Sequence, residues 1–407
     1  MLAGAGATLA SPAVVRAQAR GGVALVVGNS KYLWEAQLAN VRRDAPDVAK
    51  SFQSMGLKTE LVQDVSRDAL RRAVDKFKSA ASGANFAAFY YAGHGASWEK
   101  DTYLVSVDAD LGTPSVVKTL LPVTAVTDAM KSAANRLLVF DNCRNNPADG
   151  WRQLAAERQA GFNQDKQRAD AADADTNSLT LYSTAPGHVA LDGPPGQNSP
   201  FAAAFLGQLA SSSVDLQALP AKLRRELLIA TEGRQVVWDR NNYQSSFVMG
   251  GAVKSGGSAG TAGDRSRIIE LPNAYAFARK NGLVLPEGLI AYRPPAGSPH
   301  AQKVGAFQFM AHTPRGPSPY LFIVVSIRSE GRARLIASIQ NDAGHIWRFI
   351  NGTVSGNRLT FQPTYGRPNY LVDWSDANSG SVAALIDNRK GTGGSAARNV
   401  PFTRLDG

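Results

Sequence analysis

Short apolar runs alternate with amphipathic stretches through the first part of the chain. Five runs have the length and composition of strands in one sheet, the second being the most polar: 22–29, 58–64, 86–92, 136–142 and 178–186. Between and after them, apolar residues recur at helical spacing, which predicts helices at 39–55, 66–77, 123–133, 199–210 and 215–232. This alternation predicts an α/β fold with a mostly parallel sheet and helices on both of its faces.

Two tripeptides with distinctive chemistry follow strands of this predicted sheet. Gly93-His94-Gly95 comes directly after the third run, and Asn142-Cys143-Arg144 closes the fourth. In parallel sheets, binding and catalytic residues gather at the carboxyl ends of the strands. We therefore expect His94 and Cys143 to meet at one edge of the sheet.

The pattern changes in the last third of the chain. Short β-rich runs are separated by Gly/Asn turns such as Asn351-Gly352, which predicts a small antiparallel β sandwich or barrel. Aromatic residues alternate with apolar ones there, so we expect most of them to be core: Trp347, Phe349, Phe361, Tyr365 and Trp374. The predicted organisation is a leader at 1–19, an α/β domain at 20–252 with a polar loop at 148–177, a linker at 253–266 and a basic all-β domain at 267–407.

The leader is rich in apolar and small residues and contains an A-x-A site at Ala17 to Ala19. This is typical of the end of a secretory signal peptide, although a charged first region is missing. We expect a periplasmic or secreted protein, or a cytoplasmic one if the segment is only a disordered leader. No later stretch approaches the ~20 consecutive apolar residues that a transmembrane helix needs.

Charge is unevenly divided along the 407 residues, whose formal net charge is +11. From Arg265 onward there are 17 basic residues, 14 of them Arg, and 8 acidic ones, which gives +9. The preceding residues hold 27 basic and 25 acidic side chains, which gives +2. The simplest interpretation of this basic excess is a solvated surface, and the alternative is an anionic polymer or a membrane surface as a partner of the all-β domain. Nothing indicates a specific nucleic-acid partner.

The single cysteine excludes an intramolecular disulfide framework and any Cys-based zinc site. Cysteine catalysis requires a base that generates the thiolate and donors for the developing oxyanion. His94 can act as that base and Cys143 as the nucleophile. The backbone N–H groups of Gly95 and Cys143 can form the oxyanion hole. The alternative is a small buried cysteine and a structural histidine.

A set of motifs in order along the chain resembles the caspase-like cysteine peptidases, and most closely their bacterial metacaspase-type branch. The histidine about 50 residues before the cysteine is part of that pattern. The resemblance covers residues 22–251 and rests on ALVVGNSKY (24–32), LANVRRDA (38–45), FYYAGHG (89–95), YLVSVDA (103–109), VFDNCRNNP (139–147), YSTAPGHVALDG (182–193) and NSPF (198–201). It implies peptide-bond hydrolysis through a thioester acyl-enzyme, with His94 and Cys143 as the dyad.

Two carboxylates at matching positions bear on specificity. Asp44 lies in the stretch that resembles the family's Asn-Asp-Ala motif, and Asp141 stands two residues before Cys143. Two carboxylates in one pocket would select Arg or Lys and repel Asp, as the resemblance to metacaspases also implies. The alternative for Asp44 is a favourable charge in the first turn of a helix.

Other positions carry weaker signals. His188 is expected to be an exposed loop histidine, and Asp192 and Gly193 of the same loop could line the cleft. The loop at 148–177 contains basic residues at which a basic-specific enzyme could cut itself: Arg152, Arg158, Lys166 and Arg168. Many metacaspases need calcium, but Asp101, Asp108 and Asp110 are scattered and do not form a compact EF-hand-like cluster. The sequence therefore identifies no certain cofactor, and calcium activation stays open.

The sequence thus predicts a cysteine endopeptidase that cleaves after Arg or Lys in protein or peptide substrates. The resemblance to metacaspases favours a monomer. A second hypothesis is a catalytically weak caspase-like scaffold that binds proteins or envelope polymers through its β-domain.

Overall fold

The computed structural model describes most of the chain outside its leader, one long loop and several shorter segments. The described residues are 22–98, 101–113, 116–142, 177–185, 188, 190–194, 196–211, 213–250, 265–313, 316–341, 344–361, 369–385 and 400–407. The predicted leader, most of the loop at 148–177 and most of the linker at 253–266 therefore lie outside them. No helix within these ranges is long and apolar enough to cross a bilayer.

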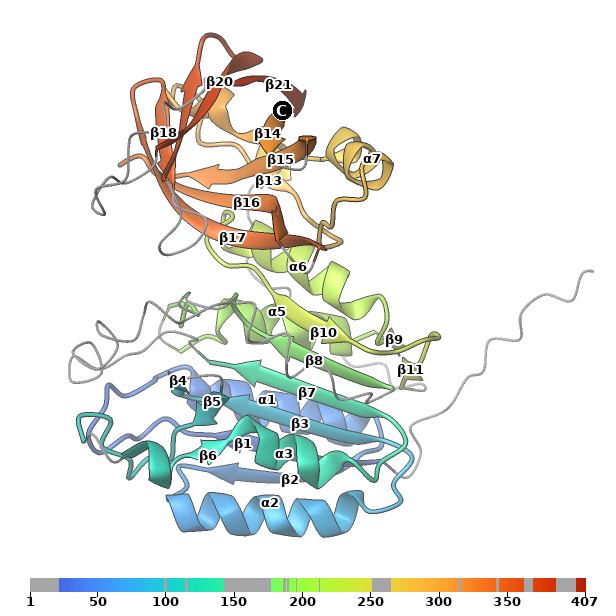
Figure 1. Cartoon of the computed structure of the whole chain (residues 1–407). Coiled ribbons are helices and arrows are strands. Elements are labelled where there is room, and N and C mark those ends of the chain that lie inside the picture. The colour runs from blue at the N-terminus through green and yellow to red at the C-terminus, as the bar shows by residue number, and fades with distance from the viewer. Residues whose placement is uncertain are drawn as a thin grey trace, which may run out of the picture.

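A six-stranded sheet forms the centre of the N-terminal α/β domain (Figure 1). Neighbouring strands are parallel except at β10, which pairs antiparallel with β8. The apolar runs become fully buried strands, because helices cover both faces of the sheet. In spatial order the strands are β10 (Trp238–Asn241), β8 (Ser178–Tyr182), β7 (Arg136–Asp141), β3 (Ala87–Ala92), β1 (Val23–Gly28) and β2 (Lys58–Gln63).

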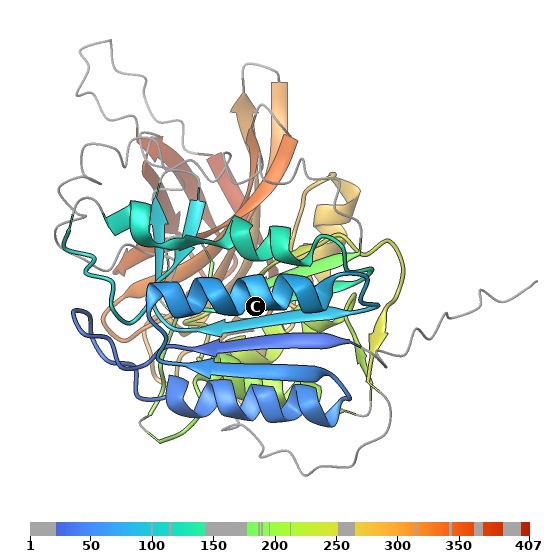
Figure 2. The ribbon, with the colours of Figure 1, turned by 90° about the horizontal axis from the view of Figure 1, so that it is seen from below.

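Helices pack on each face of this sheet, as the alternation predicted (Figure 2). Alternate residues of β1 divide between two cores: Ala24 and Val26 face one, and Leu25 and Val27 the other. The first core is covered by α1 (Val41–Ser54), α5 (Pro200–Leu209) and α6 (Leu219–Ala230), and the second by α2 (Arg67–Ala81) and α3 (Val123–Met130).

Helical periodicity located these helices well. The α1 residues expected on one face include Ala45, Val48 and Phe52, and all three are buried. Ser66 caps α2 as predicted, since its side chain accepts a hydrogen bond from the amide of Ala69 at 3.4 Å. Two short sheets and one 3₁₀ turn complete this domain: β4 (Gly95–Trp98) with β5 (Asp101–Leu104) and β6 (Leu121–Pro122), β9 (Val214–Asp215) with β11 (Val248–Met249), and the turn Val116–Thr119. A third short sheet lies between this domain and the C-terminal strands in the sequence, and pairs β12 (Ile268–Ile269) with β13 (Ala291–Tyr292).

The C-terminal strands form a closed antiparallel barrel, which decides between the two predicted all-β architectures. Its interior is filled by aromatic side chains; the rings of Phe307 and Phe322, for example, are 5.1 Å apart. Phe349, Phe361 and Trp374 are buried as expected. The strands are β14 (Gly305–Thr313), β15 (Gly316–Ile327), β16 (Arg332–Asn341), β17 (Gly344–Ser355), β18 (Arg358–Phe361), β19 (Asn369–Trp374), β20 (Ser379–Leu385) and β21 (Val400–Asp406). Helix α7 (Pro272–Lys280) and the 3₁₀ turns Arg265–Arg267 and Ala301–Lys303 precede and flank it.

The barrel and the α/β domain share a packed boundary rather than only a linker. Apolar residues of α6 and of the segment before β10 belong to the same core cluster as the barrel interior. At this boundary the rings of Trp238 in β10 and Trp347 in β17 lie 4.5 Å apart. The hydroxyl of Ser326 in β15 also donates to the carbonyl of Gly233 at 3.2 Å.

Candidate active site

The carboxyl ends of β3 and β7 lie side by side and position the predicted site. Their register pairs Ala92 with Asp141, the last residues of the two strands. His94 is two residues beyond Ala92, and Cys143 is two residues beyond Asp141 in the sequence. Residues 143–176 lie outside the described residues, so the sequence alone carries the predictions for Cys143, for Arg144 to Pro147 and for cleavage within the loop.

The backbone of His94 is fixed by two buried tyrosines. The His94 amide donates to the hydroxyl of Tyr32 at 2.7 Å, and the Tyr91 hydroxyl donates to the His94 carbonyl at 2.6 Å. Burial raises the pKa of Tyr91 to about 12 and that of Tyr32 well above its usual value, so both stay phenols that can donate. The histidine is therefore held on both sides before any substrate binds.

The imidazole of His94 is fixed in one tautomer. Its Nε2 lies 2.7 Å from the carbonyl oxygen of Ala36, and a carbonyl oxygen can only accept a hydrogen bond. Nε2 must therefore carry the proton, which leaves the Nδ1 lone pair of the neutral ring available as a base. The Tyr32 ring, 4.5 Å away by centroids, packs against the imidazole. In the neutral ring this contact therefore selects the tautomer in which Nδ1 can accept a proton.

The amide of Gly95 is directed away from the neighbouring strand. Val105 donates to the carbonyl of His94 at 3.2 Å, which makes residues 94 and 105 a hydrogen-bonding pair of the antiparallel ladder. Such pairs alternate along a ladder, so Gly95 and Leu104 form the next, non-bonding pair. The Gly95 N–H consequently points away from β5, as an oxyanion donor would have to.

Gly93 leaves room for the two tyrosine hydroxyls. A Cβ atom at this position would lie 2.6 Å from the Tyr32 hydroxyl oxygen and 2.7 Å from that of Tyr91. We expect Gly93→Ala to destabilise the protein by about 1–3 kcal/mol through this overpacking. It should also reduce activity, because the hydroxyls that hold His94 must move. Urea unfolding and peptide hydrolysis would measure the two effects.

The matched control for Gly93→Ala is Gly207→Ala in α5. A Cβ at Gly207 meets no atom within 4 Å, and alanine within a helix is favoured over glycine by roughly 0.5–1 kcal/mol. This control should therefore be neutral or stabilising with full activity. Equal stability of the two variants would contradict the steric argument.

Asp44 and Asp141 come together as one buried acidic pair. Both are less than 10% exposed, and Ser199 joins them. The Ser199 amide donates to Asp44 Oδ1 at 3.0 Å, and its hydroxyl donates to Asp141 Oδ2 at 2.8 Å. Asn198 adds a donor to Asp44 at 3.0 Å, and the Tyr90 hydroxyl adds one to Asp141 at 3.3 Å. Asp44 does lie in the first turn of α1, as the alternative explanation required. Its carboxylate nevertheless belongs to this buried pair, because it accepts from Asn198 and Ser199.

Burial and mutual repulsion shape the ionisation of this pair. Burial and the neighbouring Asp141 raise the pKa of Asp44 to about 8, and burial raises the pKa of Asp141 to about 6. The charge on Asp192 contributes to both of these shifts. Because the pair is coupled, its protons are lost in two steps that belong to both groups. Such a pair is a favourable site for a guanidinium or ammonium group, which would stabilise both charges.

The loop after β8 is tied to the start of α1, the helix that carries Asp44. The Asn40 side-chain amide donates to the carbonyls of Asp192 and Pro194, the latter at 3.0 Å. Burial raises the pKa of the Asp192 carboxyl, and the nearby His94 lowers it, so this carboxyl lies within electrostatic range of the predicted base. The contribution of Asp192 to the site was expected from the sequence. Tyr32, Asn40 and Tyr91 lie within the motifs at 24–32, 38–45 and 89–95 but were given no role from the sequence, and the Ala36 carbonyl lies outside every motif.

No cation site is evident in the part of the chain that the structure describes, where no three His, Cys, Asp or Glu residues are grouped to hold a metal ion. Asp108 instead accepts from the Arg67 amide at 3.0 Å, and Asp110 accepts from the Gly112 amide at 2.9 Å in its own turn. These described aspartates thus serve local structure, and no step of the chemistry is assigned to calcium.

Comparison with known proteins identifies one family model, and many solved chains match as well. The family model of the caspase domain matches residues 21–247, which is 227 of the 407 residues. Among solved structures, caspase-1 from Spodoptera frugiperda is similar at 12% sequence identity and a TM-score of 0.44, over 63% of this chain and 100% of that one. A search of curated proteins finds no match.

Proposed function

Since the chain belongs to the caspase-domain family of cysteine peptidases, we propose that it is an endopeptidase that cleaves after arginine or lysine. The observation that carries the specificity is the buried pair of Asp44 and Asp141, joined by Ser199 beside the end of β7. A basic side chain entering this site gains two charge-assisted partners as it stabilises their ionised forms, whereas an acidic one finds no cation and is repelled by whichever carboxylate is ionised.

The reaction proposed for this site follows from the tautomer of His94. Nδ1 takes the proton of the Cys143 thiol, and the thiolate attacks the substrate carbonyl to form a tetrahedral oxyanion. The amide of Gly95, and that of Cys143, donate to this oxygen. The intermediate collapses to a thioester as His94 returns the proton to the leaving amine, and water then hydrolyses the thioester with His94 again as base. The Ala36 carbonyl stabilises the imidazolium form of each step.

A peptide panel tests this function. Fluorogenic peptides that differ only in the residue before the scissile bond should be cleaved about 100-fold or more faster with Arg or Lys than with Asp, given the repulsion of like charges in a buried site. The value of kcat/KM for each peptide is the measurement. Equal or faster cleavage after Asp would contradict the acidic pocket, and no cleavage of any peptide would contradict the proposed activity.

Binding of a basic peptide should strengthen as the pH rises. Below the raised pKa values of Asp141 and Asp44, about 6 and about 8, the carboxyls are protonated and attract a cation weakly, so affinity should grow from about pH 5 to above pH 8. The dissociation constant should change by about tenfold per pH unit where one proton must be lost. Fluorescence anisotropy with a labelled arginine peptide and the Cys143→Ala variant measures this without turnover.

A neutral peptide is the control for this titration. A glutamine peptide of the same sequence should bind weakly and with little dependence on pH. An arginine peptide whose affinity stays flat over pH 5 to 9 would exclude the two carboxylates as its partners.

A further inference from the structure

His188 links the loop beside the acidic pair to the barrel. It was expected to be exposed, but it is only 8% exposed, because the barrel packs over it. Its Nδ1 lies 3.2 Å from Arg334 Nη1 in β16, and its Nε2 lies 3.4 Å from the carbonyl oxygen of Phe349 in β17. The imidazole also packs on the Phe349 ring at 4.8 Å between centroids. An α/β-domain residue thus has all of these partners in the barrel.

These contacts fit a single state of the His188 ring. A guanidinium only donates, so Nδ1 must accept, and Nε2 therefore carries the proton and donates to the Phe349 carbonyl. Burial, followed by the charge of Arg334, lowers the pKa of His188 to about 4, so the ring is neutral at ordinary pH. Each ring nitrogen of His188 thus has a partner of the matching kind, a donor for Nδ1 and an acceptor for Nε2. Burial alone would not produce such a match.

The segment that follows His188 leads directly to the proposed substrate pocket. Residues 188–199 are described except for 189 and 195. The Leu191 amide donates to the side-chain oxygen of Gln235 at 2.9 Å, and Asn40 holds the carbonyls of Asp192 and Pro194. The segment ends at Asn198 and Ser199, which donate to Asp44 and Asp141. One end of this segment is therefore tied to the barrel and the other to the pocket carboxylates.

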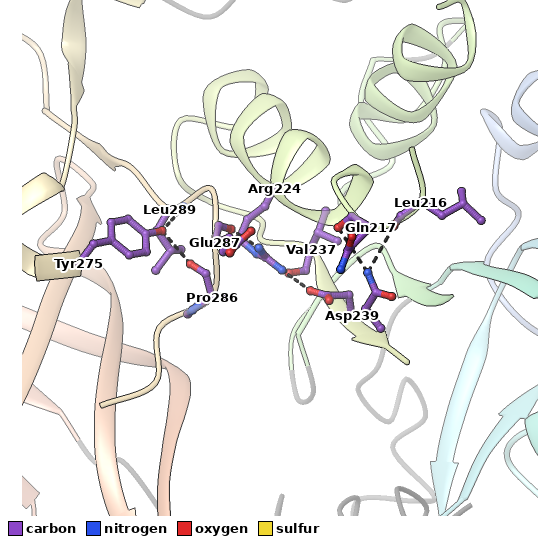
Figure 3. Close-up of polar contacts among 10 residues, drawn as sticks. Leu216, Gln217, Arg224, Val237, Asp239, Tyr275, Pro286, Glu287 and Leu289 are labelled. Atoms are coloured by element: carbon purple, nitrogen blue, oxygen red, sulfur yellow. Dashed lines mark hydrogen bonds and ion pairs between the residues drawn. The ribbon is translucent and has the colours of Figure 1, made fainter. Parts of the chain in front are cut away.

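A buried arginine stabilises the boundary between the α/β domain and the segment that leads to the barrel. Arg224 of α6 is 2% exposed and pairs with Asp239 of β10, and its guanidinium also donates to the carbonyls of Val237 and Glu287 (Figure 3). The Tyr275 hydroxyl donates to the carbonyl of Pro286 at 2.8 Å, in the same chain segment as Glu287. A buried arginine with three partners fixes the approach to the barrel against the α/β domain.

We propose that the barrel is part of the substrate-binding machinery, with Arg334 and His188 as positioning residues that hold the segment 188–199 against the acidic pocket. The substrate in this inference rests on the proposed function. The contact of His188 with Arg334 and Phe349 does not depend on that function. It assigns the C-terminal domain a role within the same molecule, in addition to any partner that its basic surface could bind.

The test compares Arg334→Ala with wild type in the full-length protein. The KM of an arginine peptide should rise about two- to thirtyfold, the range of coupling through a network of contacts, while kcat changes by less than about twofold. Hydrogen exchange should quicken in peptides covering 188–199, where the Leu191 and Ser199 amides are bonded. Arg334→Lys should restore part of the KM, since it keeps a donor for His188. His188→Asn gives a second variant in case Arg334→Ala fails to fold.

The matched control is Arg358→Ala in the same barrel. Arg358 pairs with Asp373 on the barrel surface at 2.8 Å and should leave KM and exchange unchanged. An unchanged KM and unchanged exchange at 188–199 in both test variants would overturn the proposal, as would faster exchange throughout the barrel with a parallel loss of kcat. If wild type cleaves no peptide, the proposed function fails, and exchange at 188–199 still decides whether the barrel positions this segment.

Discussion

Replacing His94 by alanine should lower kcat/KM for an arginine peptide by about 10³-fold or more, and Cys143→Ala should abolish turnover. The first variant removes the base whose Nδ1 is left free by the bond from Nε2 to the Ala36 carbonyl, and the second removes the nucleophile. Initial rates over a range of peptide concentrations measure both effects.

Alkylation gives an independent reading of this dyad. Because the chain has one cysteine, incorporation of iodoacetamide reports on Cys143 alone. His94→Ala should slow the reaction near neutral pH, since less thiolate is present without the base. The control is His300→Asn in the segment that precedes the barrel, which should leave both alkylation and turnover unchanged. Activity that survives in Cys143→Ala would exclude the mechanism, and an unaltered alkylation rate in His94→Ala would exclude His94 as its base.

Loss of one pocket carboxylate should have the second largest effect. Asp141→Asn or Asp44→Asn should lower kcat/KM for an arginine peptide by about 30- to 5,000-fold. The reason is that removing the carboxylate from a buried, hydrogen-bonded pair with the substrate guanidinium costs about 2–5 kcal/mol. The effect on a glutamine peptide should be much smaller. Comparing the two peptides separates lost recognition from lost catalysis.

Asp47→Asn is the matched control for the pocket variants. Asp47 lies on the same helix and accepts from the same Asn198 side chain at 3.1 Å, but its carboxylate is 40% exposed. This variant should keep its preference for arginine. A loss equal to that of Asp44→Asn would show that the helix, rather than the buried pair, determines recognition.

Stability should move in the opposite direction from activity in the pocket variants. The pKa values of Asp44 and Asp141 are raised in the folded state, so the stability linked to their protonation is complete below about pH 4 and is lost as the pH rises through about 6 and about 8. At about pH 8.5 an asparagine at either position avoids this loss of stability, because it has no proton to lose. Asp44→Asn and Asp141→Asn should therefore unfold at a higher urea concentration than wild type. Such a result would also show that the loss of activity in these variants does not come from misfolding.

Local patterns predicted those parts of the molecule that depend on local sequence. The apolar runs placed β1, β3 and β7 to within a residue or two, because a strand buried on both faces must be apolar throughout. The end of β3 then placed His94, and the end of β7 placed Asp141. Their proximity followed from the rule that parallel strands share one carboxyl edge.

Features made by long-range packing could not be predicted in this way. The Ala36 carbonyl that fixes the His94 tautomer is a backbone group, and any residue type could supply it. His188 seemed exposed because its burial comes from Arg334 and Phe349, well over a hundred residues later. The choice between sandwich and barrel depended on the pairing of β14 with β21, which joins strands far apart in the chain.

The position of the barrel also bears on self-association. An open sheet edge can add a strand from another molecule and so begin aggregation. The barrel stands beyond β10, one edge of the central sheet, and its Trp347 packs on Trp238 there. The opposite edge, β2, carries Lys58 and Glu60, and charges on an edge strand oppose such addition. The two borders of the sheet are thus shielded by different means, one by a folded domain and the other by electrostatic repulsion and hydration.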